Sequence, residues 1–293
     1  MLLSNELLAE PQPAVAFHWL RVGHCKGPEA MARQGGKLKL IEFPSYVGAI
    51  HHPYHGWTLF DTGYSQHFFD ATRRVPELLY RSTLPVTLPE HEHLPRQLAA
   101  LDVGVDDVRR IVVSHFHGDH VGGLLDHPQA RIIAGGSGVQ HALSLRGISA
   151  VRHAILPALL PTDLRDRHDP VEGFAEVPIA GGPAAGGLRG WDLLGDRSLL
   201  AVDLPGHMPG HLGLLFTSGG RQVMLVGDAA WTTRSYREAK PPSRLAKQIM
   251  HDWDATVATL QTLHALDAAY PDLLILPAHC PEGAEAWAAG SPR

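Results

Sequence analysis

Four side chains of the kinds that bind metal ions lie within six residues of one another. They belong to the segment Ser114-His115-Phe116-His117-Gly118-Asp119-His120, directly after the apolar residues 111–113, which are typical of a buried strand. Imidazole and carboxylate groups bind zinc, and they suit iron and manganese as well. A solvated polar turn is the alternative explanation. The chain has 20 histidines against 25 lysines and arginines together, and this excess of imidazole groups favours a metal site.

Three further residues of these kinds follow predicted strands. His207 comes soon after residues 198–204, Asp228 after residues 222–226, and His279 after residues 273–276. One histidine or aspartate at the end of a strand is more often a cap or a core residue. Three of them in the same topological position as the first cluster favour a shared site, because loops at strand ends are where α/β proteins place ligands.

The elements that must position these residues alternate along the chain. Apolar and β-branched runs predict strands at residues 37–43, 57–60, 110–114, 131–134, 198–204, 212–217, 222–226 and 273–276. Helical spacing predicts helices at residues 68–80, 94–101 and 252–269. This alternation predicts a layered α/β fold. Residues 142–190 are less regular, and we expect a flexible loop at residues 181–190.

Composition excludes several classes of protein. The chain has 293 residues, 44% hydrophobic and 19% charged, which is typical of a globular protein. A net charge of −5 provides no basic field for nucleic acid. No apolar run is long enough to span a membrane, and acidic residues precede the first basic one, Arg21, so we expect a cytoplasmic protein. Cys25 and Cys280 cannot form a disulfide framework, and we expect Cys280 to point away from His279.

The whole array, His-x-His-x-Asp-His followed by His, Asp and His, resembles the metallo-β-lactamase superfamily from about residue 37 to residue 279. The resemblance implies an α/β fold, an αββα sandwich of two mixed β-sheets flanked by helices. It implies a single domain over residues 37–293. Residues 1–36 would then be an N-terminal arm packed on that domain, covering the site or a partner in a homodimer.

The resemblance also implies the roles of the ligand-type residues. One metal ion would be held by His115, His117 and His207, and the other by Asp119, His120 and His279, with Asp228 bridging the two. We expect two zinc ions, although iron and manganese can use the same ligands. Asp61 matches an early aspartate of the superfamily that supports the histidine loop, and a plain turn carboxylate is its alternative role.

Two such ions imply a hydrolase. They would hold a bridging hydroxide that attacks a lactone or another carboxylic ester, with Asp119 and Asp228 as the catalytic carboxylates and Asp119 passing a proton to the leaving group. The stretch Pro205-Gly206-His207-Met208-Pro209-Gly210-His211 is similar to that of N-acyl-homoserine lactonases, which open quorum-signal lactones. Those lactonases usually carry a tyrosine where this chain has Trp231.

The substrate pocket is less well defined by the sequence. We expect Trp231, Gly118 and Tyr236 beside a small-molecule substrate, together with the apolar residues 156–164. An ordinary core role is the alternative for Trp231, for Tyr236 and for residues 156–164. His211 is either a supporting donor or an ordinary strand histidine. A surface loop is expected for three histidines around Pro53, namely His51, His52 and His55.

Several other functions use the same residues. A phosphodiesterase or a thioesterase could work with the same metal site. An iron-loaded redox enzyme is a further alternative, but the flavin-dependent relatives of that kind usually have a glutamate where this chain has His117. A binding module that kept the fold without catalysis is the remaining hypothesis.

Overall fold

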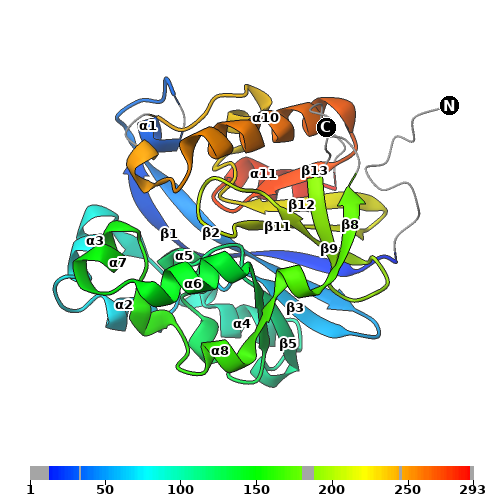
Figure 1. The fold of residues 1–293 in the computed structure, drawn as a ribbon, viewed down its shortest axis with the longest axis horizontal. Coiled ribbons are helices and arrows are strands. Elements are labelled where there is room, and N and C mark those ends of the chain that lie inside the picture. The colour runs from blue at the N-terminus through cyan, green and yellow to red at the C-terminus, as the bar shows by residue number, and fades with distance from the viewer. Residues whose placement is uncertain (1–12, 33, 180–187, 244–245, 291–293) are drawn as a thin grey trace.

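Two mixed β-sheets lie face to face at the centre of the fold, with helices on the outer side of each (Figure 1). The structure is a computed structural model that describes residues 13–32, 34–179, 188–243 and 246–290. The architecture is the expected αββα sandwich.

The first sheet has seven strands in the order β4-β1-β2-β3-β5-β6-β7. Its strands are β1 (Ala16–Pro28), β2 (Leu40–His52), β3 (Gly56–Phe60), β4 (Val86–Thr87), β5 (Val108–Val112), β6 (Arg131–Ala134) and β7 (His168–Pro170). Strands β1, β2 and β3 pair antiparallel, whereas β3, β5, β6 and β7 pair parallel. The ends of β3 and β5 therefore point the same way, toward the predicted site.

The second sheet has six strands in the order β13-β12-β11-β10-β9-β8. Its strands are β8 (Ala175–Ile179), β9 (Leu188–Asp192), β10 (Leu199–Asp203), β11 (Leu212–Ser218), β12 (Arg221–Gly227) and β13 (Leu274–Pro277). Strands β12 and β13 pair parallel and the other neighbours antiparallel. The ends of β12 and β13 thus lie side by side.

The helices cover the outer faces of both sheets. They are α1 (Glu29–Ala32), α2 (Gln66–Ala71), α3 (Leu78–Thr83), α4 (Leu94–Ala99), α5 (Gly118–Val121), α6 (Gly136–Ser144), α7 (Gly147–Arg152), α8 (Leu164–Arg167), α9 (Thr233–Arg237), α10 (Trp253–Ala269) and α11 (Pro281–Ala288). A short 3-10 helix, η6 (Ala246–Ile249), precedes α10. Figure 1 shows α10 over the second sheet, and α2 to α8 on the opposite side of the molecule.

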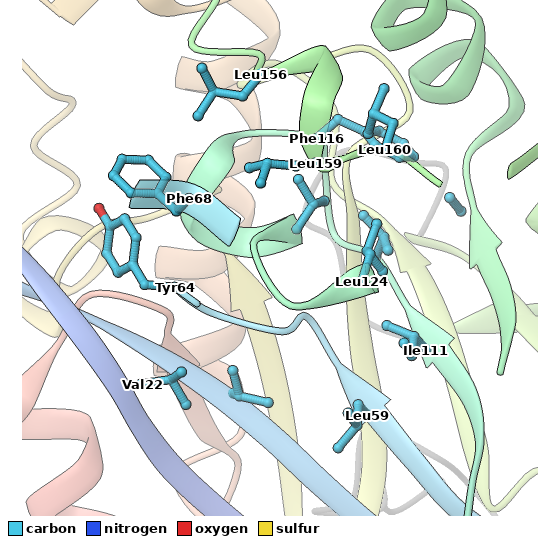
Figure 2. Close-up of a cluster of buried hydrophobic side chains, with 14 of the residues drawn as sticks. Val22, Leu59, Tyr64, Phe68, Ile111, Phe116, Leu124, Leu156, Leu159 and Leu160 are labelled. Carbon is cyan, nitrogen blue, oxygen red and sulfur yellow. The ribbon is translucent and has the colours of Figure 1, made fainter. Parts of the chain in front are cut away.

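Three layers of apolar side chains hold the sandwich together. Between the sheets, Ile50 and Val112 of the first sheet belong to the same buried cluster as Leu214 and Leu225 of the second. A second cluster packs the first sheet against its helices, and Figure 2 shows part of it. The third joins the second sheet to α10. This burial is the main stabilising contribution to the fold and fixes the strand ends relative to one another.

The N-terminal region differs from the expected arm. Residues Ala16–Pro28 form strand β1 inside the first sheet and pair with β2 from Ala16 opposite His51 to Pro28 opposite Leu40. The register shifts between Arg21 and His24, so the side-chain alternation changes phase within the strand. This irregularity hides the strand from a period-two pattern. Residues 1–12 of the predicted arm lie outside the described residues.

The bounds of other predicted elements also differ from those in the structure. The predicted helix at residues 68–80 is two helices, α2 and α3, because Pro76 falls between them and cannot continue a helix. The predicted strand at residues 37–43 begins at Leu40 and continues to His52. Most of the predicted loop at residues 181–190 lies outside the described residues, and its last three residues belong to β9.

No helix within the described residues combines the length and the apolar character needed to cross a membrane. The homodimer and the cytoplasmic location stay predictions.

Candidate metal centre

The predicted ligand residues all leave the ends of strands at one edge of the sandwich. The His115 to His120 segment follows β5, His207 follows β10, Asp228 follows β12 and His279 follows β13. Backbone hydrogen bonds join these loops, since Leu212 donates to the Ser114 carbonyl at 2.9 Å and Ala278 donates to that of Gly227 at 3.1 Å. The structure therefore brings the four segments together, as the sequence predicted.

Gly227 permits this close approach. Its φ is +49°, in the left-handed region, and a Cβ there would lie 2.9 Å from Nε2 of His211 and 3.0 Å from Cβ of Ser114. A larger residue would push Asp228 away from the histidine loop.

One group of ligand-type atoms consists of His115, His117, His207 and Asp228. The Nδ1 atom of His117 lies 3.0 Å from Nε2 of His115 and 3.1 Å from Nε2 of His207. Nitrogen ligands around a tetrahedral zinc ion lie roughly 3.3 Å apart, so the three atoms already converge as metal ligands do. Burial, and then the neighbouring imidazoles, hold the pKa values of His115 and His117 well below the usual range. Both rings are therefore neutral and have a lone pair to offer.

The second group consists of Asp119, His120 and His279, and Asp228 lies between the groups. Oδ1 of Asp228 is 2.9 Å from Nε2 of His279 and 3.3 Å from Nε2 of His120, whereas its Oδ2 is 3.2 Å from Nε2 of His207. Oδ2 of Asp119 lies 3.6 Å from Nε2 of His279. One carboxylate thus turns an oxygen toward each group, as a bridging ligand would.

The buried polar atoms of this centre fit a cation. Nε2 of His120 and Oδ1 of Asp228 make no hydrogen bond of good geometry to a described residue. Burial lowers the pKa of His120, but the carboxylates of Asp119, Asp228 and Asp61 outweigh it and raise that pKa well above its usual value. The same carboxylates favour a metal ion, so the residues present suit metal binding.

Asp61 supports the histidine loop from behind, so it is more than a turn carboxylate. Its Oδ2 lies 2.8 Å from Nδ1 of His120, and its Oδ1 accepts the backbone N–H of Ser114 at 2.7 Å. The Ser114 hydroxyl donates to Oδ2 of Asp61 at 2.8 Å and lies 2.9 Å from Nδ1 of His115. These contacts place the ring protons of His115 and His120 on Nδ1 and leave Nε2 free for a metal ion.

Three other hydrogen bonds hold residues of the centre in place, and their acceptors are a carbonyl oxygen, a sulfur atom and an imidazole nitrogen. Nδ1 of His279 donates to the Pro44 carbonyl at 2.7 Å, and Nδ1 of His207 donates to the sulfur of Met250 at 3.1 Å. Nε2 of the buried His211 accepts the backbone N–H of Asp228 at 3.1 Å. Burial lowers the pKa of His211 to about 3, so this ring stays neutral and able to accept. His211 is therefore a support, although as an acceptor.

The sequence reasoning missed Ser114, Pro44 and Met250 in these roles. The position of Ser114 directly before the His-x-His pair was a usable signal. A carbonyl group and a thioether from distant segments carry no such signal.

A mostly apolar cavity opens beside the centre. Five of the ligand-type residues line it, along with Cys25, Met31, Phe43, Tyr80, Leu84, Ala154, Trp231 and Ile249. Trp231 is thus at the cavity as expected, and its indole N–H donates to Oδ2 of Asp228 at 2.9 Å. The cavity can shield a reacting group from water.

The structure corrects two expected pocket residues. A Cβ at Gly118 would lie 3.1 Å from Leu156 and 3.3 Å from Phe68, so this position faces the hydrophobic cluster of Figure 2. Tyr236 is 1% exposed, and its hydroxyl donates to the Ile275 carbonyl at 3.2 Å, in the core beneath α10. Both carry packing roles that local sequence does not distinguish from pocket roles.

Residues 156–164 have the ordinary core role. Leu156, Leu159, Leu160 and Leu164 belong to the core cluster between the first sheet and its helices. Cys280 is buried and its sulfur lies 3.2 Å from the backbone nitrogen of Thr233, away from the centre as expected.

The prediction of a surface loop is wrong for His52, because this residue is only 2% exposed. Its Nε2 lies 3.0 Å from Oδ2 of Asp196, while its Nδ1 accepts the backbone N–H groups of Tyr54 at 3.1 Å and His55 at 3.2 Å. A further group of ligand-type side chains, hereafter the turn cluster, consists of His52, His55 and Asp196. Their candidate ligand atoms lie within 4.8 Å of one another.

Comparisons with known proteins agree with this geometry. The family model described as the metallo-beta-lactamase superfamily matches residues 40–279. A probable metallo-hydrolase of Mycobacterium tuberculosis is 31% identical over 78% of this chain and 72% of that protein. An N-acyl homoserine lactonase of Rhizobium rhizogenes is 30% identical over 58% of this chain and 57% of that protein. A solved N-acyl homoserine lactone hydrolase, with the product N-hexanoyl-L-homoserine bound at its catalytic metal centre, has the same fold. Its TM-score is 0.69 at 19% identity, over 93% of this chain and 96% of that one.

Proposed function

The chain belongs to the metallo-beta-lactamase superfamily and is a metal-dependent hydrolase, and from this premise we propose that it opens lactones or cleaves related carboxylic esters with two zinc ions. The observation that carries the proposal is the position of Asp228, whose two oxygens face two separate groups of ligand-type atoms. A single-metal site would need only one of those groups.

His115, His117 and His207 would hold one ion, and Asp119, His120 and His279 the other. Nitrogen and carboxylate ligands without sulfur suit zinc. When bound, the two ions would polarise the scissile carbonyl group and lower the pKa of a water molecule toward neutrality.

The remaining steps fall to the chain's own residues. Asp61 and the Pro44 carbonyl orient His120 and His279, and Trp231 steadies Asp228 through its N–H. Asp119 lines the cavity and is the carboxylate best placed to pass a proton to the leaving alcohol. The apolar walls exclude bulk water from the reacting group.

The cavity favours carboxylic esters over phosphodiesters. Among the described residues, neither lysine nor arginine lines it, so no fixed positive side chain would meet a phosphate. Apolar walls instead suit an acyl group. The lactonase of R. rhizogenes and the structure with bound N-hexanoyl-L-homoserine support a lactone as the substrate.

The test is a substrate panel on zinc-loaded protein. It comprises N-hexanoyl homoserine lactone, a p-nitrophenyl ester, a thioester and bis-p-nitrophenyl phosphate, each with and without a chelator. We expect chelator-sensitive turnover of the lactone and the ester, with two zinc ions per chain by metal analysis. Fully loaded protein that cleaves only the phosphodiester, or only the thioester, would refute the proposal.

A further inference from the structure

The cavity beside the metal centre has one polar side chain that is not accounted for by the proposed function. Tyr80, on α3, lines the cavity, and its hydroxyl makes no hydrogen bond to any described residue. The other polar groups on the wall outside the ligand set are engaged. The Trp231 N–H donates to Asp228, and the Cys25 thiol is hydrogen-bonded with the Tyr64 hydroxyl.

Packing fixes the Tyr80 ring at this wall. The ring meets Phe68 edge-on, with centroids 5.6 Å apart and planes at 66°, and Tyr80 is 8% exposed. Burial, and then the Asp119 carboxylate, hold its pKa well above the usual range. The hydroxyl is therefore a protonated donor at every pH near neutrality.

A hydrogen-bond donor at this wall matters because Trp231 has no N–H left to donate to a substrate. An indole has a single N–H, and here it is taken by Oδ2 of Asp228. A substrate in the cavity that carries a second carbonyl group would find no other free side-chain donor among the described residues outside the ligand set. An unpaired acceptor buried against apolar walls would weaken binding.

We propose that the Tyr80 hydroxyl donates a hydrogen bond to a second carbonyl oxygen of the substrate, such as an amide, and so selects lactones or esters that carry one. The cavity has a volume of about 90 Å³, below the ~300–1,000 Å³ of pockets that enclose a drug-sized ligand, and it opens to solvent. We therefore expect it to hold the part of the substrate around the scissile carbonyl, with the second oxygen within a few bonds of that group. The proposal rests on the proposed function and adds a specificity-determining residue to it.

The experiment compares two lactones that differ in that acceptor, N-butanoyl homoserine lactone and γ-butyrolactone. The variant is Tyr80→Phe, which removes one hydroxyl. Its matched control is Tyr46→Phe, because Tyr46 is also 8% exposed and stacks on Trp19 at 5.4 Å but does not line the cavity. For Tyr80→Phe we expect kcat/KM to fall about 10–100-fold with the amide-bearing lactone and at least fivefold less with γ-butyrolactone. Tyr46→Phe should leave the ratio between the two lactones unchanged.

Equal losses with both lactones, or no loss, would overturn the role of Tyr80. A second measurement needs no turnover: binding of N-butanoyl-homoserine and of 4-hydroxybutyrate to zinc-loaded protein by calorimetry. Tyr80→Phe should weaken only the former, and equal binding by wild type and variant would overturn the inference. If the wild type opens neither lactone and cleaves no carboxylic ester but shows this selective binding, the proposed function fails while the role of Tyr80 stands.

Discussion

Two clusters of histidine and aspartate occur in this molecule, the metal centre at the strand ends and the turn cluster of His52, His55 and Asp196. In both, the candidate ligand atoms lie within 4.8 Å of one another. They differ in what stands behind the rings. At the metal centre, acceptors such as Asp61 and the Pro44 carbonyl face Nδ1 of His120 and His279, so the lone pair of Nε2 points inward.

In the turn cluster, donors stand behind the ring instead. Backbone N–H groups of Tyr54 and His55 point at Nδ1 of His52, so the ring proton lies on Nε2 and faces Asp196. A protonated nitrogen cannot bind a metal ion. Proximity of ligand-type residues is therefore not sufficient, because the partners behind each ring decide which nitrogen is free.

The largest effect is expected from the residue shared by both metal groups. Asp228→Ala removes the oxygens that face His279 and His207, so bound zinc should fall from two ions to fewer than one per chain after dialysis. Lactone kcat/KM should fall on the order of 10³-fold. Metal analysis and steady-state kinetics measure both. Retention of two zinc ions would show that Asp228 does not link the groups.

The next effect tests the acceptor behind His120. Asp61→Asn keeps an acceptor and suits the φ of +62° at this position, but it removes the negative charge at 2.8 Å from the ring. Zinc affinity, measured by competition with a chelator, should fall about 10–100-fold. Unchanged affinity would mean that the charge behind the ring does not matter.

A smaller effect is expected behind His207. Met250→Leu replaces the thioether that accepts from Nδ1 with an apolar group of similar volume. Because sulfur is a weak acceptor, zinc affinity should fall by less than about tenfold, well below the loss in Asp61→Asn. A loss of zinc affinity equal to or larger than that in Asp61→Asn would show that the thioether is not the weaker acceptor of the two.

The smallest effect on metal binding is expected in the turn cluster. His52→Ala should leave two zinc ions bound and the lactone activity unchanged. It should cost about 1–3 kcal/mol of unfolding free energy, because a buried ring is removed and two backbone N–H groups lose their acceptor. Denaturant unfolding and metal analysis check this. Loss of one zinc ion would make the turn cluster a metal site.

The sequence predicted that the seven ligand-type residues converge, and the structure brings them together, because the relevant signals are local. Each ligand residue lies within a few positions of an apolar strand, and strand ends at one edge of a sandwich must lie close together. The sequence-based predictions were wrong where contacts between distant parts of the chain determine the structure. The bulge in β1 disturbs the alternation, and the burial of Tyr236 depends on packing under α10.

The sequence by itself determined the types, the order and the strand-end positions of the seven ligand-type residues, since these follow from short stretches of chain. Only the tertiary structure decided which nitrogen each ring presents. Pro44 lies 235 residues from His279, Asp61 lies 59 residues from His120, and Met250 lies 43 residues from His207. Contacts at such separations exist only after the two sheets have packed.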